Sequence, residues 1–387
     1  MKRRSKELPE ELWESILNRL ALGDDYGDLQ SPSLVCKKFL SITSRLRRKL
    51  VANSDPFNSN KCEVLSRALE RFGNLKEMEL VGVFPEPDVN YPVLKIASSG
   101  LDLQSLRFHD LPISPSADTF RRLGSAMKNL KALRCRGFDS LRDPDLVHIA
   151  DGLPGLEELD IRYPMNKLEQ WKIRYPELSK HMVTDAGIEA ISRKLPGLRR
   201  VYISGNEGCS DLSLIALSSN CVLLNEITCR SCNVTRRGID WVLCHSTNLT
   251  SLKVGFYRSL RNSTFGASDD DLKIYATGLR ELDIWGYDDQ ERIVWSIVKA
   301  GIPLEKLKLR GGQSLFDIRG VTTLLRACPT LKHFKFEAGF SFNDDAMRDL
   351  CRCLPHIVSI KLRGVSSLTE TAFSSSQKNV LRFQKLY

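Results

Sequence analysis

The sequence lacks long hydrophobic runs. No stretch approaches the roughly 18 consecutive apolar residues that a membrane-spanning helix needs. The basic start at Met1–Lys6 is not followed by the apolar segment of a secretory signal. The sequence therefore indicates neither a membrane span nor secretion, and we expect a protein of the cytoplasm, the nucleus or both. In such a compartment the 11 cysteines are expected to be reduced thiols.

Recognisable catalytic and nucleic-acid-binding motifs are also absent. The sequence has no Gly-x-Ser-x-Gly elbow, no phosphate-binding P-loop and no His-Glu-x-x-His, and none of its six histidines falls in a catalytic pattern. The net charge is +10, yet no long Lys/Arg run and no base-reading motif accompanies it. We therefore expect a non-catalytic protein without a cofactor, whose positive charge favours acidic partners rather than nucleic acid.

What the sequence does contain is a repeated apolar pattern. The motif L-x-x-L-x-L, with other apolar residues or Cys allowed at the leucine positions, occurs eleven times. The copies start at Leu75, Leu103, Leu130, Leu156, Leu198, Leu224, Leu249, Leu279, Leu304, Leu331 and Ile357. Nine of the ten steps between successive starts are 25 to 30 residues long, which indicates an array of structural repeats.

Each motif follows a segment with helical features. In residues 183–197, Thr184 or Asp185 is placed to cap a helix, Ile188 and Ile191 recur at helical spacing, and a Pro-Gly pair ends the segment. Each unit is therefore expected to form one short strand and one helix. The leucine positions of the strand should face the interior and the positions between them should face outward. A single unit cannot bury its apolar face, so the units should stack into a solenoid.

The units resemble the cysteine-containing class of leucine-rich repeats. Cysteines next to the strands fit that class: Cys135, Cys229, Cys232 and Cys328. The resemblance covers about residues 60–365 and implies an α/β fold, a right-handed horseshoe solenoid with a parallel concave sheet and convex helices. We expect residues 51–387 to form this domain with about 11 repeats.

One cysteine pair has the spacing of a zinc site. Cys229 and Cys232 form a Cys-x-x-Cys motif. Cys229, however, occupies the last inward position of a repeat strand, which should bury it apart from its neighbours, and buried cysteines are common core residues. We therefore expect no metal site.

The first 50 residues do not follow the repeat. Leu8–Leu20 has a proline at a helix start and apolar residues every four positions, and Ser33–Ile42 is again helical in pattern. Some 40 residues in three short helices hold little core of their own, so such a module needs a neighbour. The two blocks, LPEELWESILNRL and SLVCKKFLSI, resemble the F-box. We expect residues 1–50 to form an F-box helical module.

The F-box resemblance implies docking on a Skp-family adaptor, which connects to the cullin core of a ubiquitin ligase. Carried over by position, the adaptor-binding residues would be Leu8, Pro9, Leu12, Ile16, Leu20, Val35, Cys36, Lys37 and Phe39. Phe39 stands where the family more often has Trp, a departure that keeps an aromatic anchor. The alternative is that these helices only cap the open end of the solenoid.

The outward strand positions and two long inter-repeat segments are the expected recognition surface. In the last three repeats, six of nine outward residues are Lys or Arg. Earlier units are mixed, with acidic outward positions at Glu158, Asp160 and Asp283 among others. The candidate substrate-binding residues are Tyr202, Trp285, Lys306, Lys308, Arg310, Lys335, Lys361, Arg363 and, in the longest inter-repeat segment, Trp171. These basic positions favour an acidic or phosphorylated protein target, whereas a merely solvated charged face is the alternative.

Together these features resemble the plant-type F-box leucine-rich-repeat proteins. The implied function is substrate recognition in an SCF-type ubiquitin ligase, with a Skp-family adaptor, the cullin core and a protein substrate as partners. Two alternatives remain open: a receptor that senses a hormone or inositol phosphate, and a repeat scaffold with no role in ubiquitin transfer.

Overall fold

The computed structural model divides into two compact units, Met1–Leu159 and Asp160–Tyr387. It describes residues 8–21, 29–53, 61–82, 89–109, 111, 113–138, 141–163, 183–256, 273–285, 290–310, 318–337, 344–345, 348, 358–363 and 382–386. Within these ranges, no helix combines the length and apolar character needed to cross a membrane.

The first unit begins with three short helices around a small core. These helices are α1 (Glu10–Ala21), α2 (Gln30–Ser33) and α3 (Lys37–Leu46). The core consists of Leu17, Leu29, Ile42 and Leu46, with Trp13 and Phe39 packed against it. The α3 helix begins where the thiol of Cys36 accepts a hydrogen bond from the backbone N–H of Phe39. Four buried residues make a small core, as the length of this module predicted.

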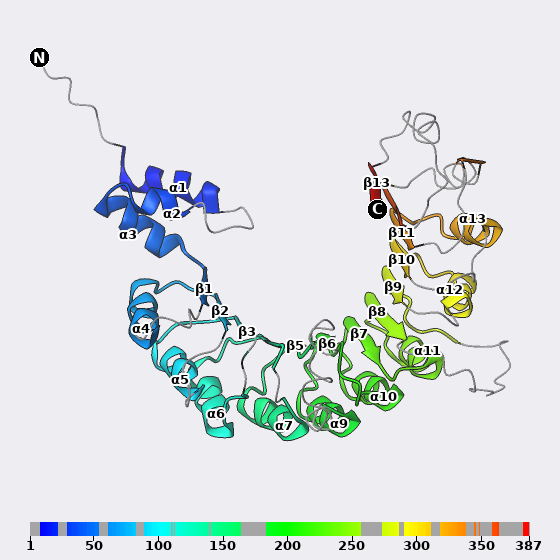
Figure 1. The fold of residues 1–387 in the computed structure, drawn as a ribbon, viewed down its shortest axis with the longest axis horizontal. Coiled ribbons are helices and arrows are strands. Elements are labelled where there is room, and N and C mark those ends of the chain that lie inside the picture. The colour runs from blue at the N-terminus through cyan, green and yellow to red at the C-terminus, as the bar shows by residue number, and fades with distance from the viewer. Residues whose placement is uncertain are drawn as a thin grey trace, which may run out of the picture. The chain divides into compact units, whose positions relative to one another are not determined.

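The rest of the first unit consists of alternating strands and helices. Its strands are β1 (Lys49–Asn53), β2 (Glu77–Val81), β3 (Ser105–His109) and β4 (Ala132–Arg136), which pair in parallel in chain order, and β5 (Glu158–Asp160) begins at its end. Its helices are α4 (Lys61–Arg71), α5 (Asn90–Ser98), α6 (Ala117–Ala126) and α7 (Asp143–Gly152). The helices form one layer and the strands form the other (Figure 1).

The second unit repeats this architecture. Its strands are β6 (Arg200–Tyr202), β7 (Glu226–Cys232), β8 (Ser251–Phe256), β9 (Glu281–Trp285), β10 (Lys306–Arg310), β11 (His333–Glu337), β12 (Ser359–Arg363) and β13 (Arg382–Leu386). Neighbours in this order pair in parallel. Its helices are α9 (Asp185–Lys194), α10 (Asp211–Asn220), α11 (Arg236–His245), α12 (Gln290–Lys299) and α13 (Ile318–Arg326).

The strand positions alternate as the repeated motif predicts. In β10, Leu307 and Leu309 are buried under the helices, whereas Lys306 on the opposite face is exposed. The α/β leucine-rich-repeat solenoid expected from the sequence is therefore confirmed. The structure adds two strands to the eleven expected ones, because β1 and β13 extend the parallel pairing beyond the first and last motif.

Aspartates at the helix starts connect successive repeats of the second unit. The carboxylate of Asp185 accepts hydrogen bonds from the backbone N–H and the hydroxyl of Ser210, the residue that caps α10, at 2.8 and 2.6 Å. Asp211 accepts the same two bonds from Thr235, the cap of α11, at 2.7 and 2.5 Å. Negative charge is favoured at a helix N-terminus. Each aspartate therefore stabilises its own helix and fixes the register of the next one.

Cys229 and Cys232 lie together in the core, contrary to the expectation that the strand would separate them. The β7 strand has a bulge between Arg230 and Cys232, where Ser231 adopts a φ of 55°, and this turn returns Cys232 to the buried side. The hydrogen bond with Cys232, together with burial, raises the pKa of the Cys229 thiol well above its ordinary value. Among the described residues no cluster of His, Cys, Asp and Glu has a metal-binding arrangement.

Candidate functional site

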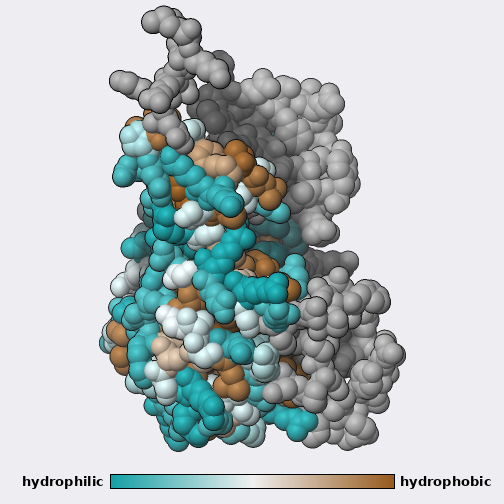
Figure 2. Space-filling model, turned by 90° about the vertical axis from the view of Figure 1, so that its left-hand side faces the viewer, coloured by the Kyte–Doolittle hydropathy of each residue, from teal (hydrophilic) through white to brown (hydrophobic). Residues whose placement is uncertain are grey.

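The N-terminal helices expose a set of large apolar side chains. Six such residues of this module are between 42% and 80% exposed: Leu8, Leu12, Ile16, Leu20, Leu34 and Val35. Apolar surface over these helices is visible near the top of Figure 2. We call these six residues the apolar docking face.

Helix α1 has two apolar sides, one buried and one exposed. Trp13 and Leu17 face the small core, while Leu12 and Ile16 lie on a neighbouring side that no described residue buries. Residues four apart lie on the same side of an α-helix. The apolar residues that recur every four positions in the sequence, Leu12, Ile16 and Leu20, therefore form an exposed stripe along α1. An exposed apolar set of this kind marks an interaction surface.

The adaptor-binding residues inferred from the sequence fall into two groups. Pro9, Cys36 and Lys37 are exposed, like the leucines beside them. Phe39 is only partly exposed: its ring packs on Trp13, with 4.7 Å between the ring centroids, and lies against the small core. Leu34, the most exposed of the six at 80%, is not among the adaptor-binding residues carried over from the F-box pattern. Its position next to Val35 in the SLVCKKF block could have indicated it.

The orientation of α1 on α3 is fixed by an ion-pair cluster. The Arg45 guanidinium on α3 contacts the carboxylates of Glu10 and Glu14 on α1 at 2.6 and 3.5 Å. The hydrogen bond with Glu10 raises the pKa of Arg45 above its ordinary value. These groups are largely exposed, so their contribution to stability is small. Their effect is to hold the two helices in one arrangement beneath the docking face.

The end of α3 caps the first repeat. Asn74 donates a hydrogen bond of 3.0 Å to the carbonyl of Arg45 and accepts one of 3.1 Å from Arg48. The guanidinium of Arg47 lies 5.2 Å from the centre of the Phe72 ring. Burial lowers the pKa of Arg47, and the nearby positive charge of Arg71 lowers it further. These contacts use the C-terminal end of α3, so capping leaves the apolar docking face uncovered.

The strand face opposite the helices of the second unit is lined with charged side chains. We call this surface the charged sheet face. The Arg162 guanidinium binds Asp160 at 2.7 Å and lies 4.8 Å from the centre of the Tyr202 ring, whose hydroxyl donates to Glu226 at 3.0 Å. Tyr202 is thus held within the face by internal contacts.

Acidic residues of β9 neutralise much of the basic charge on this face. Lys308 contacts Glu281 at 2.8 Å, and both Arg230 and Arg310 bind the same oxygen of Asp283, at 2.6 and 3.1 Å. Asp283 occupies an outward strand position, yet only 1% of its side chain is exposed because these cations cover it. Glu158 and Asp160, which were also expected to face solvent, are buried in the same way under Arg134 and Arg162.

The pKa values on this face follow from the ion pairs. Burial alone would raise the pKa of Glu281, but a hydrogen bond from Lys308 and the charge of Lys253 hold it below its ordinary value. The pKa of Arg230 is lowered chiefly by burial, against the attraction of Asp283. Charges on the face are therefore coupled to one another, and Lys308 and Arg310 bind acids of the chain itself.

Trp285 is presented to solvent beside this network. Its side chain is 37% exposed, and Gly255 is its neighbour on β8. A Cβ atom at Gly255 would lie 3.3 Å from the Arg230 side chain and 3.3 Å from the Trp285 ring. The missing side chain therefore lets Arg230 cross β8 and reach Asp283 on β9.

Three of the remaining candidate residues are lysines with weaker internal pairing. Lys306 and Lys361 are exposed, and Lys335 contacts Glu337 at 3.3 Å. Arg363 lies in β12, but its side chain is outside the described set, and Trp171 lies outside the described residues altogether. The structure thus brings most of the candidate substrate-binding residues onto one sheet face. Only part of their positive charge is available to a partner, because Lys308 and Arg310 already bind acids of the chain.

Comparison with known proteins gives matches for both parts of the chain. The F-box domain model matches residues 6–50. F-box/LRR-repeat protein 4 of Bos taurus is 23% identical over 194 residues, which are 49% of this chain and 29% of that protein. The chain therefore matches less than a third of this relative's length.

Solved structures are similar to this chain at low sequence identity. A chain from the crystal structure of the Rad7 and Elc1 complex in yeast has a TM-score of 0.51 and 15% identity, covering 97% of this chain and 91% of its own. The leucine-rich repeat-containing protein LegL7 from Legionella pneumophila has a TM-score of 0.45 and 11% identity, covering 86% and 97%.

Proposed function

Because this chain is an F-box/leucine-rich-repeat protein, we propose that it is the substrate-recognition subunit of an SCF-type ubiquitin ligase. In this proposal the F-box module docks on a Skp-family adaptor, and the repeat domain binds a protein target. The observation that supports it best is the apolar docking face, which contains Leu12, Ile16 and Leu34. None of the described residues covers this face.

Removing the apolar docking face from water favours a lasting partner. Fully burying a Leu, Ile or Val side chain is worth about 1.5–3 kcal/mol. The docking face holds six such side chains. A partner that covers them gains a large apolar contact, and the ion pairs of Arg45 with Glu10 and Glu14 hold the helices in place beforehand. Binding to a preformed surface costs less conformational entropy than binding to an unordered one.

The chain itself performs no chemistry in this proposal. It brings a target close to a ubiquitin-conjugating enzyme recruited through the cullin core, and proximity alone accelerates transfer to a target lysine. The likeness to a chain of the yeast Rad7 and Elc1 complex, a crystal structure with two different proteins, agrees with a protein partner.

Adaptor capture tests the docking proposal. The double variant Leu12→Asp, Ile16→Asp places two charges on the apolar docking face without touching the core, and we expect adaptor affinity to fall about a hundredfold or more. The matched control is Leu212→Asp, because Leu212 is a 62% exposed leucine on α10 of the second unit. Purified chains would be titrated against a Skp-family adaptor by calorimetry.

Unchanged adaptor binding in the double variant would refute the proposal and favour a scaffold whose N-terminal helices only cap the repeats. The capping contacts of Asn74 with Arg45 and Arg48 are the observation that supports this second candidate. Because those contacts do not use Leu12 or Ile16, the two functions predict different results in the same titration.

A further inference from the structure

We propose that the lysine row formed by Lys308, Lys335 and Lys361 on the charged sheet face, together with Lys306, binds an acidic, unphosphorylated segment of the target protein. This inference rests on the proposed function, since it specifies the chemistry of the target that the repeat domain would recruit. It does not depend on which adaptor the F-box module binds.

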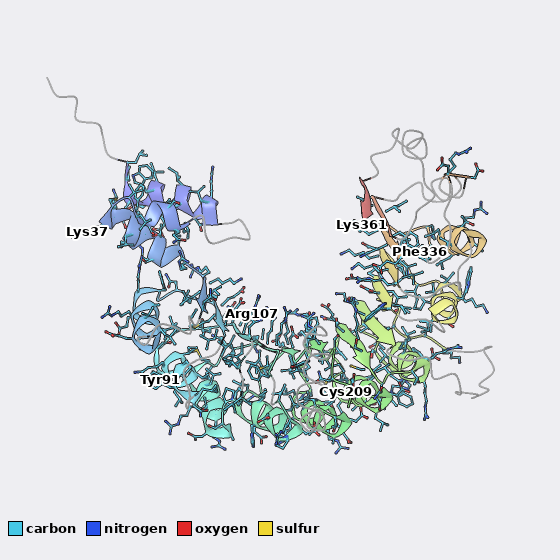
Figure 3. All side chains as sticks on the ribbon, in the orientation of Figure 1. Lys37, Tyr91, Arg107, Cys209, Phe336 and Lys361 are labelled. Atoms are coloured by element: carbon cyan, nitrogen blue, oxygen red, sulfur yellow. The ribbon has the colours of Figure 1, made fainter. Side chains whose placement is uncertain are left out.

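The register of the sheet aligns the lysines. Lys308 on β10 is the partner of Lys335 on β11, which is the partner of Lys361 on β12. Neighbouring strands lie about 4.8 Å apart, so three positive charges follow one another across the sheet. In Figure 3, Lys361 lies on the strand side away from the helices, whereas Phe336 lies between the sheet and α13. The row therefore faces outward.

From Lys308 to Lys361, fewer carboxylates of the chain offset the lysine charges. Lys308 contacts Glu281 at 2.8 Å and lies 3.9 Å from Asp283, so two acids offset its charge. Lys335 has its contact with Glu337 at 3.3 Å. Lys361 is exposed, and no carboxylate among the described residues contacts it. The excess of positive charge is therefore largest at β12 and attracts an acidic partner to that end.

The arrangement of the available donors favours a string of carboxylates over a single phosphate. Bidentate guanidinium groups give the strongest and most specific contacts to one phosphate or one carboxylate. On this face Arg162 binds Asp160, while Arg230 and Arg310 both bind Asp283. The donors of the row itself are lysine ammonium groups on flexible stems, which act as separate point charges on neighbouring strands. Arg363, also on β12, has a side chain outside the described set. Such a row fits a string of acidic side chains better than a single phosphate.

A peptide titration tests this inference. The probe is a fluorescently labelled ten-residue peptide that alternates Glu and Ser, and the protein is the full chain in complex with its adaptor. At low salt we expect binding to weaken about tenfold for Lys361→Glu and about a hundredfold for Lys335→Glu, Lys361→Glu, and to be lost when Gln replaces Glu in the peptide. The charge-matched control is Lys299→Glu, an exposed lysine at the end of α12, for which less than about a twofold change is expected.

A second variant tests the row by strengthening it. Glu337→Gln removes the contact that offsets Lys335, so the acidic peptide should bind about threefold more tightly. This outcome cannot arise from misfolding. A weakening by Lys299→Glu equal to that by Lys361→Glu would overturn the inference, because it would show attraction by net charge alone.

Two further arms complete the test. A phosphoserine peptide of equal total charge that bound tenfold more tightly than the Glu peptide would overturn the choice of carboxylates.

Adaptor binding is measured for every variant, and peptide binding is also measured on the chain alone. Lysine variants that lose the peptide but keep the adaptor support the inference. If Leu12→Asp, Ile16→Asp kept full adaptor affinity while the lysine variants still lost the peptide, the inference would stand and the proposed function would fall.

Discussion

The apolar docking face exposes apolar side chains to water, whereas the charged sheet face pairs most of its charges within the chain. The docking face exposes Leu12, Ile16 and Leu34, apolar groups that gain free energy whenever a partner removes them from water. The sheet face pairs most of its charges internally, as Arg230 and Arg310 do with Asp283. Paired charges are stable in water without a partner. The comparison indicates a lasting contact at the first surface and an exchangeable, salt-dependent contact at the second.

Stability measurements on one residue from each surface give the largest expected contrast. Asp283→Ala leaves Arg230 and Arg310 without their shared counter-charge, and we expect the free energy of unfolding of the second unit to fall by about 3 kcal/mol. Leu12→Ala removes an exposed side chain and should change stability by less than about 0.5 kcal/mol. Hydrogen exchange of the β9 and α1 amides reports both values in one experiment.

Equal effects of these two substitutions would contradict the comparison. If Asp283→Ala were neutral, the sheet face would be an ordinary solvated surface. If Leu12→Ala destabilised the module by more than about 1 kcal/mol, Leu12 would belong to the core rather than to the docking face. Trp285→Ala serves as a control for the sheet face, because its partly exposed ring is not part of the Asp283 pairing.

Substitution of Leu34, which the F-box pattern does not mark, gives the next largest expected effect. Leu34→Asp should weaken adaptor binding by about thirtyfold, because a charge replaces the most exposed apolar side chain of the docking face. Folding should be unaffected, which circular dichroism would verify. The control Val64→Asp alters a 56% exposed valine on α4 of the same unit and should leave adaptor affinity unchanged. An unaltered affinity for Leu34→Asp would restrict docking to the α1 stripe.

The fold was predictable because burial of a repeated apolar edge imposes a regular spacing on the sequence. Leu307 and Leu309 illustrate the rule, since both fall at motif positions and both are buried. Strands β1 and β13 lack the full motif, and they form because an unpaired strand edge offers hydrogen bonds to any extended neighbour. Such pairing depends on backbone groups, which leave little trace in the residue pattern.

The candidate sites were predictable only in part, because side-chain pairing between strands is not visible in a single motif. Asp283 and Arg310 are 27 residues apart in sequence, and Arg230 reaches Asp283 across β8 only because residue 255 is glycine. The sequence identified both charges but not their pairing. Phe39 illustrates the opposite case: the F-box pattern marked it as important, while the structure assigns it to packing on Trp13.

A pH titration of stability gives the smallest expected effect and tests whether the sheet face is internally paired. Against the opposing effect of burial, Lys308 and Lys253 hold the pKa of Glu281 below its ordinary value of 4.5. A carboxylate with a lowered folded-state pKa contributes stability that is fully present above the unfolded-state pKa and is lost as the pH falls through the folded-state value. Glu281→Gln should therefore lower the unfolding temperature by a few degrees at pH 7, and this difference should shrink as the pH falls below 4.5.

The Lys308→Gln background provides the control, because it lacks the 2.8 Å contact that is the main favourable influence on the Glu281 carboxylate. In that background the effect of Glu281→Gln on the unfolding temperature at pH 7 should be smaller, which is the signature of a direct coupling between the two groups. If Glu281→Gln lowered the unfolding temperature equally at neutral pH and well below the ordinary pKa of glutamate, the charge of Glu281 would not stabilise the fold. The sheet face would then hold more unpaired positive charge than its contacts indicate.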